Sequence, residues 1–118
     1  MIVAIPVDDD RETICVSFGR APYFLIHHSE TGATELVGNP AAEAQGGAGI
    51  QAAQLVADQG ANALITVRCG QNAAKVFQAA GIAVYKADGL SAAENLNALS
   101  EGKLSVLTSF HAGFHGRA

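Results

Sequence analysis

The apolar residues of the first third of the chain follow a strand pattern. Residues 1–7 form a short apolar run rich in β-branched side chains that ends at three consecutive aspartates, which predicts a buried strand. A second apolar run covers residues 23–29, and a third ends at Val37 after a turn at residues 31–32. Because this turn is short, we expect the second and third strands to form an antiparallel hairpin.

The remainder of the chain alternates between helical and strand patterns. The predicted elements are, in order, helix 48–59, strand 63–67, helix 71–80 and strand 82–87. A third helix begins at Ser91, which forms a capping-box pattern with Glu94, and it ends near Gly102. The positions expected to face the core are Ile50, Ala53 and Ala57 in the first helix, Ala73, Val76, Phe77 and Ala80 in the second, and Ala93, Leu96 and Leu99 in the third.

This order of elements predicts a single α/β domain. An antiparallel first half followed by alternating helices and strands gives one mixed five-stranded sheet with helices on both faces. The domain is expected to cover residues 1–104, and a Gly- and His-containing tail covers residues 105–118. Ligands of such sheets bind beyond the carboxyl ends of the strands, so the loops 8–19 and 68–70 are expected to meet at a site.

Composition excludes several classes of function. The 118 residues are 49% hydrophobic and 15% charged, as in a globular domain, and the net charge of -4 disfavours general nucleic-acid binding. The amino terminus lacks a basic segment, and its apolar run stops at residue 7, so neither a signal peptide nor a membrane span is expected. Cys15 and Cys69 form no CxxC pair, and a reducing cytoplasm is the simplest setting.

The segment 67–77, VRCGQNAAKVF, contains the first candidate site. Gly70 permits a sharp turn out of a strand, and Gln71 and Asn72 begin a helix whose free amides attract anions. Arg68 adds a full positive charge, and these surroundings are expected to lower the pKa of Cys69. The segment is either an anion site or an ordinary turn with a small buried thiol. A nucleophilic cysteine needs a neighbouring base, and the sequence alone places no histidine beside Cys69.

Two further loops are candidate ligand cradles. Gly46, Gly47 and Gly49 precede a helix and allow backbone amides to approach a ligand closely, although their spacing matches neither the dinucleotide fingerprint nor the P-loop. The alternative is a flexible loop that ends in a helix cap. Gly19 lies in a turn before the second strand, and Arg20 beside it is either a solvated turn residue or a ligand clamp.

The histidines and carboxylates give weaker signals. His111 and His115 are four residues apart, a spacing that chelates metal on a helix, but Gly113 between them disfavours a helix. His27 and His28 lie on opposite faces of a strand and cannot chelate one ion together. The three aspartates at 8–10 are most simply a solvated turn, and the further strand-end carboxylates of a two-metal nuclease are missing.

Several motifs taken together resemble the dinitrogenase iron–molybdenum cofactor biosynthesis family. They are SFGRAPYF, GNPAAEAQGGAGIQAA, GQNAAKVFQAAGIAVYKA and EGKL, in this order, within residues 1–104. The resemblance implies a ribonuclease H-like sheet without catalytic carboxylates, and a protein that carries iron–sulfur or molybdenum–iron–sulfur clusters. Length, acidity and the tail are similar to a subset, the orange proteins, which hold a molybdenum–copper sulfide cluster without covalent attachment.

One position departs from the family pattern. A histidine often precedes Phe-Gly-Arg in the family, and here that position is Ser17, which removes a cluster ligand. The resemblance therefore implies a non-enzymatic carrier that holds a preformed anionic cluster by charge and hydrogen bonds, with donor or acceptor proteins as partners. The cofactor-binding residues implied are Ser17, Gly19, Arg20, Gly46, Gly47, Arg68, Cys69, Gly70, Gln71 and Asn72.

Metal ligation and the rival functions stay open at this point. The candidate metal ligands are Cys69, which suits copper, and His111 and His115. The alternatives to a molybdenum–copper sulfide carrier are an iron–sulfur or iron–molybdenum cofactor chaperone of nitrogenase type, a hydrolase built on the ribonuclease H-like fold, and a metal-free regulatory binding module.

Overall fold

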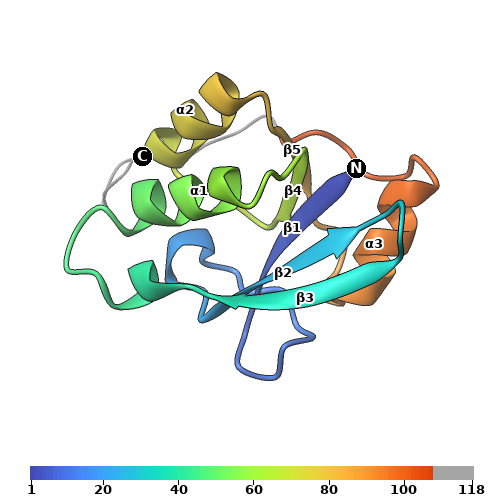
Figure 1. Cartoon of the computed structure of the whole chain (residues 1–118), viewed down its shortest axis with the longest axis horizontal. Coiled ribbons are helices and arrows are strands. Elements are labelled where there is room, and N and C mark those ends of the chain that lie inside the picture. The colour runs from blue at the N-terminus through green and yellow to red at the C-terminus, as the bar shows by residue number, and fades with distance from the viewer. Residues whose placement is uncertain (108–118) are drawn as a thin grey trace.

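A computed structural model describes residues 1–107 and shows one five-stranded mixed sheet with helices on both faces (Figure 1). The elements are β1 (Ile2–Val7), η1 (Phe18–Arg20), β2 (Tyr23–His28), β3 (Ala33–Gly38), η2 (Pro40–Glu43), α1 (Ala48–Asp58), β4 (Ala63–Thr66), α2 (Gln71–Ala80), β5 (Ala83–Lys86) and α3 (Ala92–Ser100), where η marks a 3-10 helix. The strand order is β3-β2-β1-β4-β5. The predicted α/β class and mixed sheet are confirmed; the likeness to ribonuclease H stays a prediction.

Strand pairing follows the pattern expected from the sequence. β2 pairs antiparallel with both β1 and β3, whereas β4 pairs parallel with both β1 and β5. Gly32 adopts a φ of +75° in the tight turn between β2 and β3, a conformation that glycine reaches without strain. The direction of pairing therefore changes at β1, and the loops that follow β1 and β4 leave the same end of the sheet.

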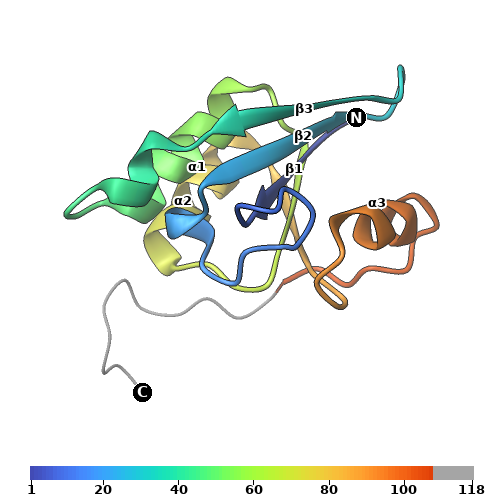
Figure 2. The same cartoon turned by 90° about the horizontal axis from the view of Figure 1, so that it is seen from below.

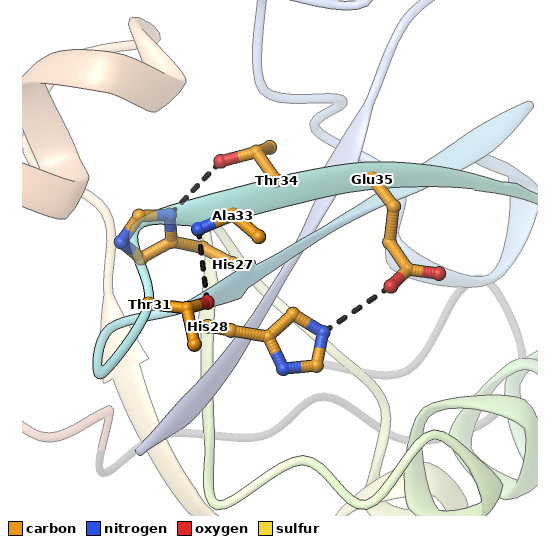
Figure 3. A network of polar contacts seen from close by, with 6 residues as sticks. All are labelled: His27, His28, Thr31, Ala33, Thr34 and Glu35. Carbon is orange, nitrogen blue, oxygen red and sulfur yellow. Dashed lines mark hydrogen bonds and ion pairs between the residues drawn. The ribbon is translucent and has the colours of Figure 1, made fainter.

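The β2–β3 hairpin explains the paired histidines. His27 Nδ1 lies 3.0 Å from Thr34 Oγ1, and His28 Nε2 lies 3.2 Å from Glu35 Oε2 (Figure 3). The two rings occupy opposite faces of β2, as alternation along a strand requires. The prediction that they lie on opposite faces of a strand is confirmed, and both contacts tie β2 to β3.

Each face of the sheet has its own core. Helices α1 and α2 pack side by side on one face, where Phe24, Leu64 and Phe77 are buried. Helix α3 covers the other face, where Ile5 and Ile65 are buried (Figure 2). Alternate residues of β1 enter alternate cores, so this central strand is buried on both sides.

Three of the predicted core positions are wrong. Ile50 is 45% exposed because the first turn of α1 borders a cavity rather than the sheet, and Ala80, in the last turn of α2, is also exposed. Ala93 is exposed because α3 turns Ala92 and Asn95 inward instead. The side-chain amide of Asn95 accepts from Asp88 N and donates to the carbonyls of Asp88, Gly89 and Ser91, which fixes the rotation of the helix.

The chain remains packed against the sheet beyond residue 104. Lys86 N donates to Ser105 O, Leu107 N donates to Val84 O, and Leu107 is buried. Residues 105–107 therefore lie along β5, the strand at one edge of the sheet. Among residues 1–107, no helix combines the length and apolar character needed to cross a membrane. His111 and His115 lie outside the described residues.

Candidate functional site

A cavity of about 480 Å³ opens where the first turns of α1 and α2 meet η1. Its lining includes nine of the ten predicted cofactor-binding residues: Ser17, Gly19, Arg20, Gly46, Gly47, Arg68, Cys69, Gly70 and Asn72. The tenth, Gln71, lines a separate groove beside β5. Three loops that are far apart in the sequence therefore meet at one place. The topology predicted this for the loops after β1 and β4, and the structure adds the glycine loop before α1. Gln71 is the exception, because it lines the other groove. That the nine residues bind a cofactor stays a prediction.

Backbone contacts bring the three loops together. Ser17 and Arg68 form an isolated parallel bridge between the loops that follow β1 and β4. On the other side, a side-chain carbon added at Gly19 would lie 2.9 Å from Gly49 N and 3.0 Å from its Cα, which is closer than real contacts allow. Gly19 is therefore glycine because η1 and α1 cross at van der Waals distance.

Both long helices at the cavity begin without a side-chain cap. The N-cap of α1 is Gly47, with φ +70°, and the N-cap of α2 is Gly70; neither first turn contains an acidic residue. Within residues 1–107, the first-turn amides of the two helices make no hydrogen bond to a protein acceptor, up to Gln51 N in α1 and Ala74 N in α2. Five residues with such free amides belong to the cavity lining, namely Ala48, Gly49, Ile50, Asn72 and Ala73.

The charges at the cavity are of one sign. Among residues 1–107, Arg20 and Arg68 are the charged residues in its lining and no carboxylate belongs to it, although the whole chain has a net charge of -4. Two positive helix ends add to the two guanidinium groups. The cavity therefore combines free N–H donors, positive charge and an apolar wall that includes Phe18 and Ile50, which is a suitable environment for a bulky anion.

The two arginines are not equivalent. Arg20 Nη1 donates to Ala42 O at 3.1 Å and also to Ala44 O, so this guanidinium is already engaged by the protein. The Arg68 side chain, by contrast, makes no hydrogen bond or ion pair with any other described residue. The family resemblance implied that both arginines bind the cofactor. The structure brings both to the cavity, but only the Arg68 guanidinium is without a protein partner among residues 1–107.

Cys69 differs from the sequence-based expectation. Its side chain is 2% exposed, and burial raises the pKa of the thiol to about 11. The expected lowering of this pKa is therefore wrong, because burial removes the solvent that would stabilise the thiolate. A neutral, buried thiol whose cavity contains no carboxylate or imidazole from residues 1–107 does not behave as an activated nucleophile.

Sequence reasoning missed Asn39, which joins two of the three loops. Its buried side-chain amide donates to Ala21 O at 2.8 Å and Gly19 O at 3.3 Å, and its oxygen accepts from Ala41 N. Asn39 and Pro40 directly follow the third predicted strand, and the signal that could have found this role is that asparagine in a turn commonly bonds the backbone in this way. Phe18 was also missed. Its ring centroid lies 5.3 Å from the ring centroids of both Phe24 and Phe77, and these contacts anchor η1 to the core.

Other metal and nuclease candidates find no support among the described residues. Within residues 1–107, no three side chains of His, Cys, Asp or Glu gather in an arrangement that would hold a metal ion. Asp10 accepts hydrogen bonds from the amides of Glu12 and Thr13 and from the Thr13 hydroxyl, so its carboxylate closes its own turn. The three aspartates at 8–10 thus form a loop, as the simplest interpretation predicted.

Comparison with known proteins decides the family. The chain matches the family described as dinitrogenase iron-molybdenum cofactor over residues 1–102. This protein belongs to that family. An uncharacterised protein of Methanocaldococcus jannaschii is 37% identical over 107 residues, which cover 88% of this chain and 89% of the relative.

Two solved structures of other proteins are similar over almost their whole length. The apo form of the orange protein of Desulfovibrio gigas superimposes with a TM-score of 0.84 at 30% identity, covering 92% of this chain and 93% of the other. An NMR structure of a NifB-like protein from Thermotoga gives a TM-score of 0.79 at 36% identity, covering 96% and 98%. Family and neighbours together relate this chain to nitrogenase cofactor and orange-protein roles.

Proposed function

We propose that this protein binds an anionic metal–sulfur cluster without covalent attachment, in the cavity between η1, α1 and α2, and carries it or holds it during assembly. The observation that carries the proposal is the lining of this cavity. Two arginines and the free amides of two uncapped helices converge there, and no carboxylate from the described part of the chain does. The cluster is cargo for a carrier, and donor or acceptor proteins would be its partners.

The residues at the cavity suit such a cargo. A metal–sulfur cluster is a soft polyanion with a sulfur surface, so it needs N–H donors, guanidinium groups and apolar walls rather than oxygen ligands. A volume of about 480 Å³ lies within the usual range of small-molecule sites. Since no three-ligand set exists among residues 1–107, hydrogen bonds and charge would supply most of the binding.

We favour a molybdenum–copper sulfide cluster within this class. The support is the likeness to the D. gigas orange protein, together with Ser17 at the place where the family pattern has a histidine. Cys69 Sγ is the one candidate thiol in the cavity lining, and copper is the metal that prefers it. Because the free thiol is protonated, ligation would release one proton per cluster bound. Full loading of a Cys69→Ser variant would rule out ligation by this residue.

Two alternative functions differ from this proposal, and from each other, in the metal that the protein would contain. The first is a chaperone for an iron–sulfur or iron–molybdenum cofactor, which the match to the nitrogenase cofactor family favours. The second is a metal-free regulatory module, which the absence of a preformed ligand set among residues 1–107 favours. We propose a carrier rather than an enzyme, acting in the reducing cytoplasm that two free cysteines suggest.

The test is elemental analysis with a visible spectrum, on protein purified without oxygen from its native host. Molybdenum, copper and sulfide together, with sulfur-to-metal charge-transfer bands, are the expected result. Iron with acid-labile sulfide would instead establish the nitrogenase-type chaperone. Protein free of metal in repeated preparations would contradict cluster binding and leave the regulatory module.

A further inference from the structure

Arg20 holds the loop that leads into α1. Its Nη1 atom donates to Ala42 O in η2 and to Ala44 O, the C-cap of that helix, which are 22 and 24 residues away along the chain. Two carbonyls on one guanidinium nitrogen make charge-assisted hydrogen bonds, which are stronger than neutral ones. The arginine thus connects η1 to the last ordered turn before the glycines of the cavity.

The segment Gln45–Gly47 has little else to fix it. Gln45, Gly46 and Gly47 are exposed, and a side-chain carbon at Gly46 would meet nothing within 4 Å. Glycine is the residue with the greatest backbone freedom, so this loop needs contacts at its ends to hold one conformation. At its start these contacts come from Arg20, and at its end from the close approach of Gly19 to Gly49.

The loop determines where the free amides of α1 point. Gly47 is the N-cap, and the amides of Ala48, Gly49 and Ile50 follow it directly at the cavity wall. If η2 and α1 shifted relative to one another, these three amides would move away from their places in the cavity wall. Preorganised donors bind an anion more tightly than mobile ones, because no ordering cost remains to be met on binding.

We propose that Arg20 is a positioning residue, which holds the glycine loop and thereby the amide donors of α1, whereas Arg68 is the arginine that contacts the anion. This division of roles rests on the proposed function of the cavity. It differs from the expectation that both arginines bind the ligand. The reason is that the Arg20 guanidinium already has protein acceptors, whereas the Arg68 guanidinium has none among residues 1–107.

The first test needs no ligand. Backbone 15N relaxation of the apo protein should show ordered amides at residues 45–49 in the wild type, with order parameters of about 0.85. In Arg20→Met, which keeps the aliphatic stem, these order parameters should fall below about 0.6. Arg68→Met is the matched control and should leave this loop unchanged. Arg20→Lys, a second variant, keeps the charge but loses the planar fork, and it should also loosen the loop. Unchanged order parameters in both Arg20 variants would overturn the proposal.

The second test uses tetrathiomolybdate, a sulfur-coated anion whose absorbance reports binding. Arg20→Met should weaken its binding about tenfold, comparable to the loss of one hydrogen bond to a charged group. Adding Gly46→Ala to Arg20→Met should raise the affinity for tetrathiomolybdate again by about threefold, because alanine fits the open space at this position and restricts the loop. Gly46→Ala alone is the control for any direct effect of the added methyl group.

The same Gly46→Ala change should not rescue Arg68→Met, because that variant loses a contact rather than an ordered loop. Equal rescue of both arginine variants, or rescue of neither, would overturn the positioning role. Failure of the wild type to bind tetrathiomolybdate would count against the proposed function of the cavity. The relaxation data would then still decide whether Arg20 holds the loop.

Discussion

Arg68 is the residue whose charge the proposed site depends on most directly. Arg68→Glu would place a carboxylate among two helix N-termini and beside a polyanion, so we expect loss of cluster retention with an unchanged fold. The measurement is the metal content per chain after anaerobic purification from the native host. Lys86→Glu, an exposed position outside the cavity lining, is the matched control because it changes the net charge equally. Normal loading of Arg68→Glu would remove this arginine from the site.

The buried thiol of Cys69 makes stability depend on pH. Its pKa rises from 9.0 to about 11 on folding, so between these values the folded protein keeps a proton that the unfolded chain has lost. Stability is therefore full below about pH 9 and falls as the pH approaches about 11, by a contribution on the order of 2 kcal/mol. Urea unfolding of apo protein at several pH values should show this fall, and Cys69→Ala should reduce it. An identical pH dependence in the variant would contradict burial of the thiol.

At the scale of elements, the crossing of η1 and α1 is the contact on which the cavity is built. Gly19→Ala would force a methyl group against the backbone of Gly49, which cannot move aside as a flexible side chain does. We expect a loss of about 1–3 kcal/mol in the free energy of unfolding, measured by urea denaturation, and weaker anion binding. Gly38→Ala in β3 is the control, since an added carbon there meets nothing within 4 Å. Equal stability of the two variants would show that the crossing is not tight.

Most elements could be predicted because their signals are local. The bounds predicted for α2, 71–80, match the observed Gln71–Ala80, and Ser91 Oγ accepts from Glu94 N as the capping box requires. The rotation of α3 could not be predicted from apolar spacing. It is set by Asn95, whose side chain forms hydrogen bonds with backbone carbonyls and one backbone N–H of the preceding loop. These backbone groups lie close together only in the folded chain. A buried polar residue of this kind resembles a surface residue in the sequence.

At the scale of the whole molecule, the sheet has two different edges. β3 lies at one edge, while residues 105–107 run along β5 at the other. We expect a chain ended after Leu107 to keep the fold and its anion binding. A chain ended after Leu104 lacks the buried Leu107 side chain and should lose about 1.5–3 kcal/mol of stability. It should also expose β5 as an edge strand, which favours aggregation.

Thermal unfolding and light scattering would compare the two shortened chains with the full chain. Equal stability of all three would show that residues 105–107 contribute nothing to the domain. The chain ended after Leu107 also tests the predicted metal ligands His111 and His115, because it lacks both. Loss of metal from this chain alone would place a ligand in the removed segment.

The sequence by itself determined the order of the elements, the mixed sheet, the family and nine of the residues that line the cavity. Those features depend on local patterns of apolar residues, glycines and caps, or on motifs that can be read along the chain. Only the tertiary structure decided that Cys69 is a protonated thiol and that Arg20 is bound to the loop while Arg68 has no partner among the described residues. Desolvation and the pairing of donors with acceptors depend on neighbours brought together by folding, and no local pattern in the sequence records them.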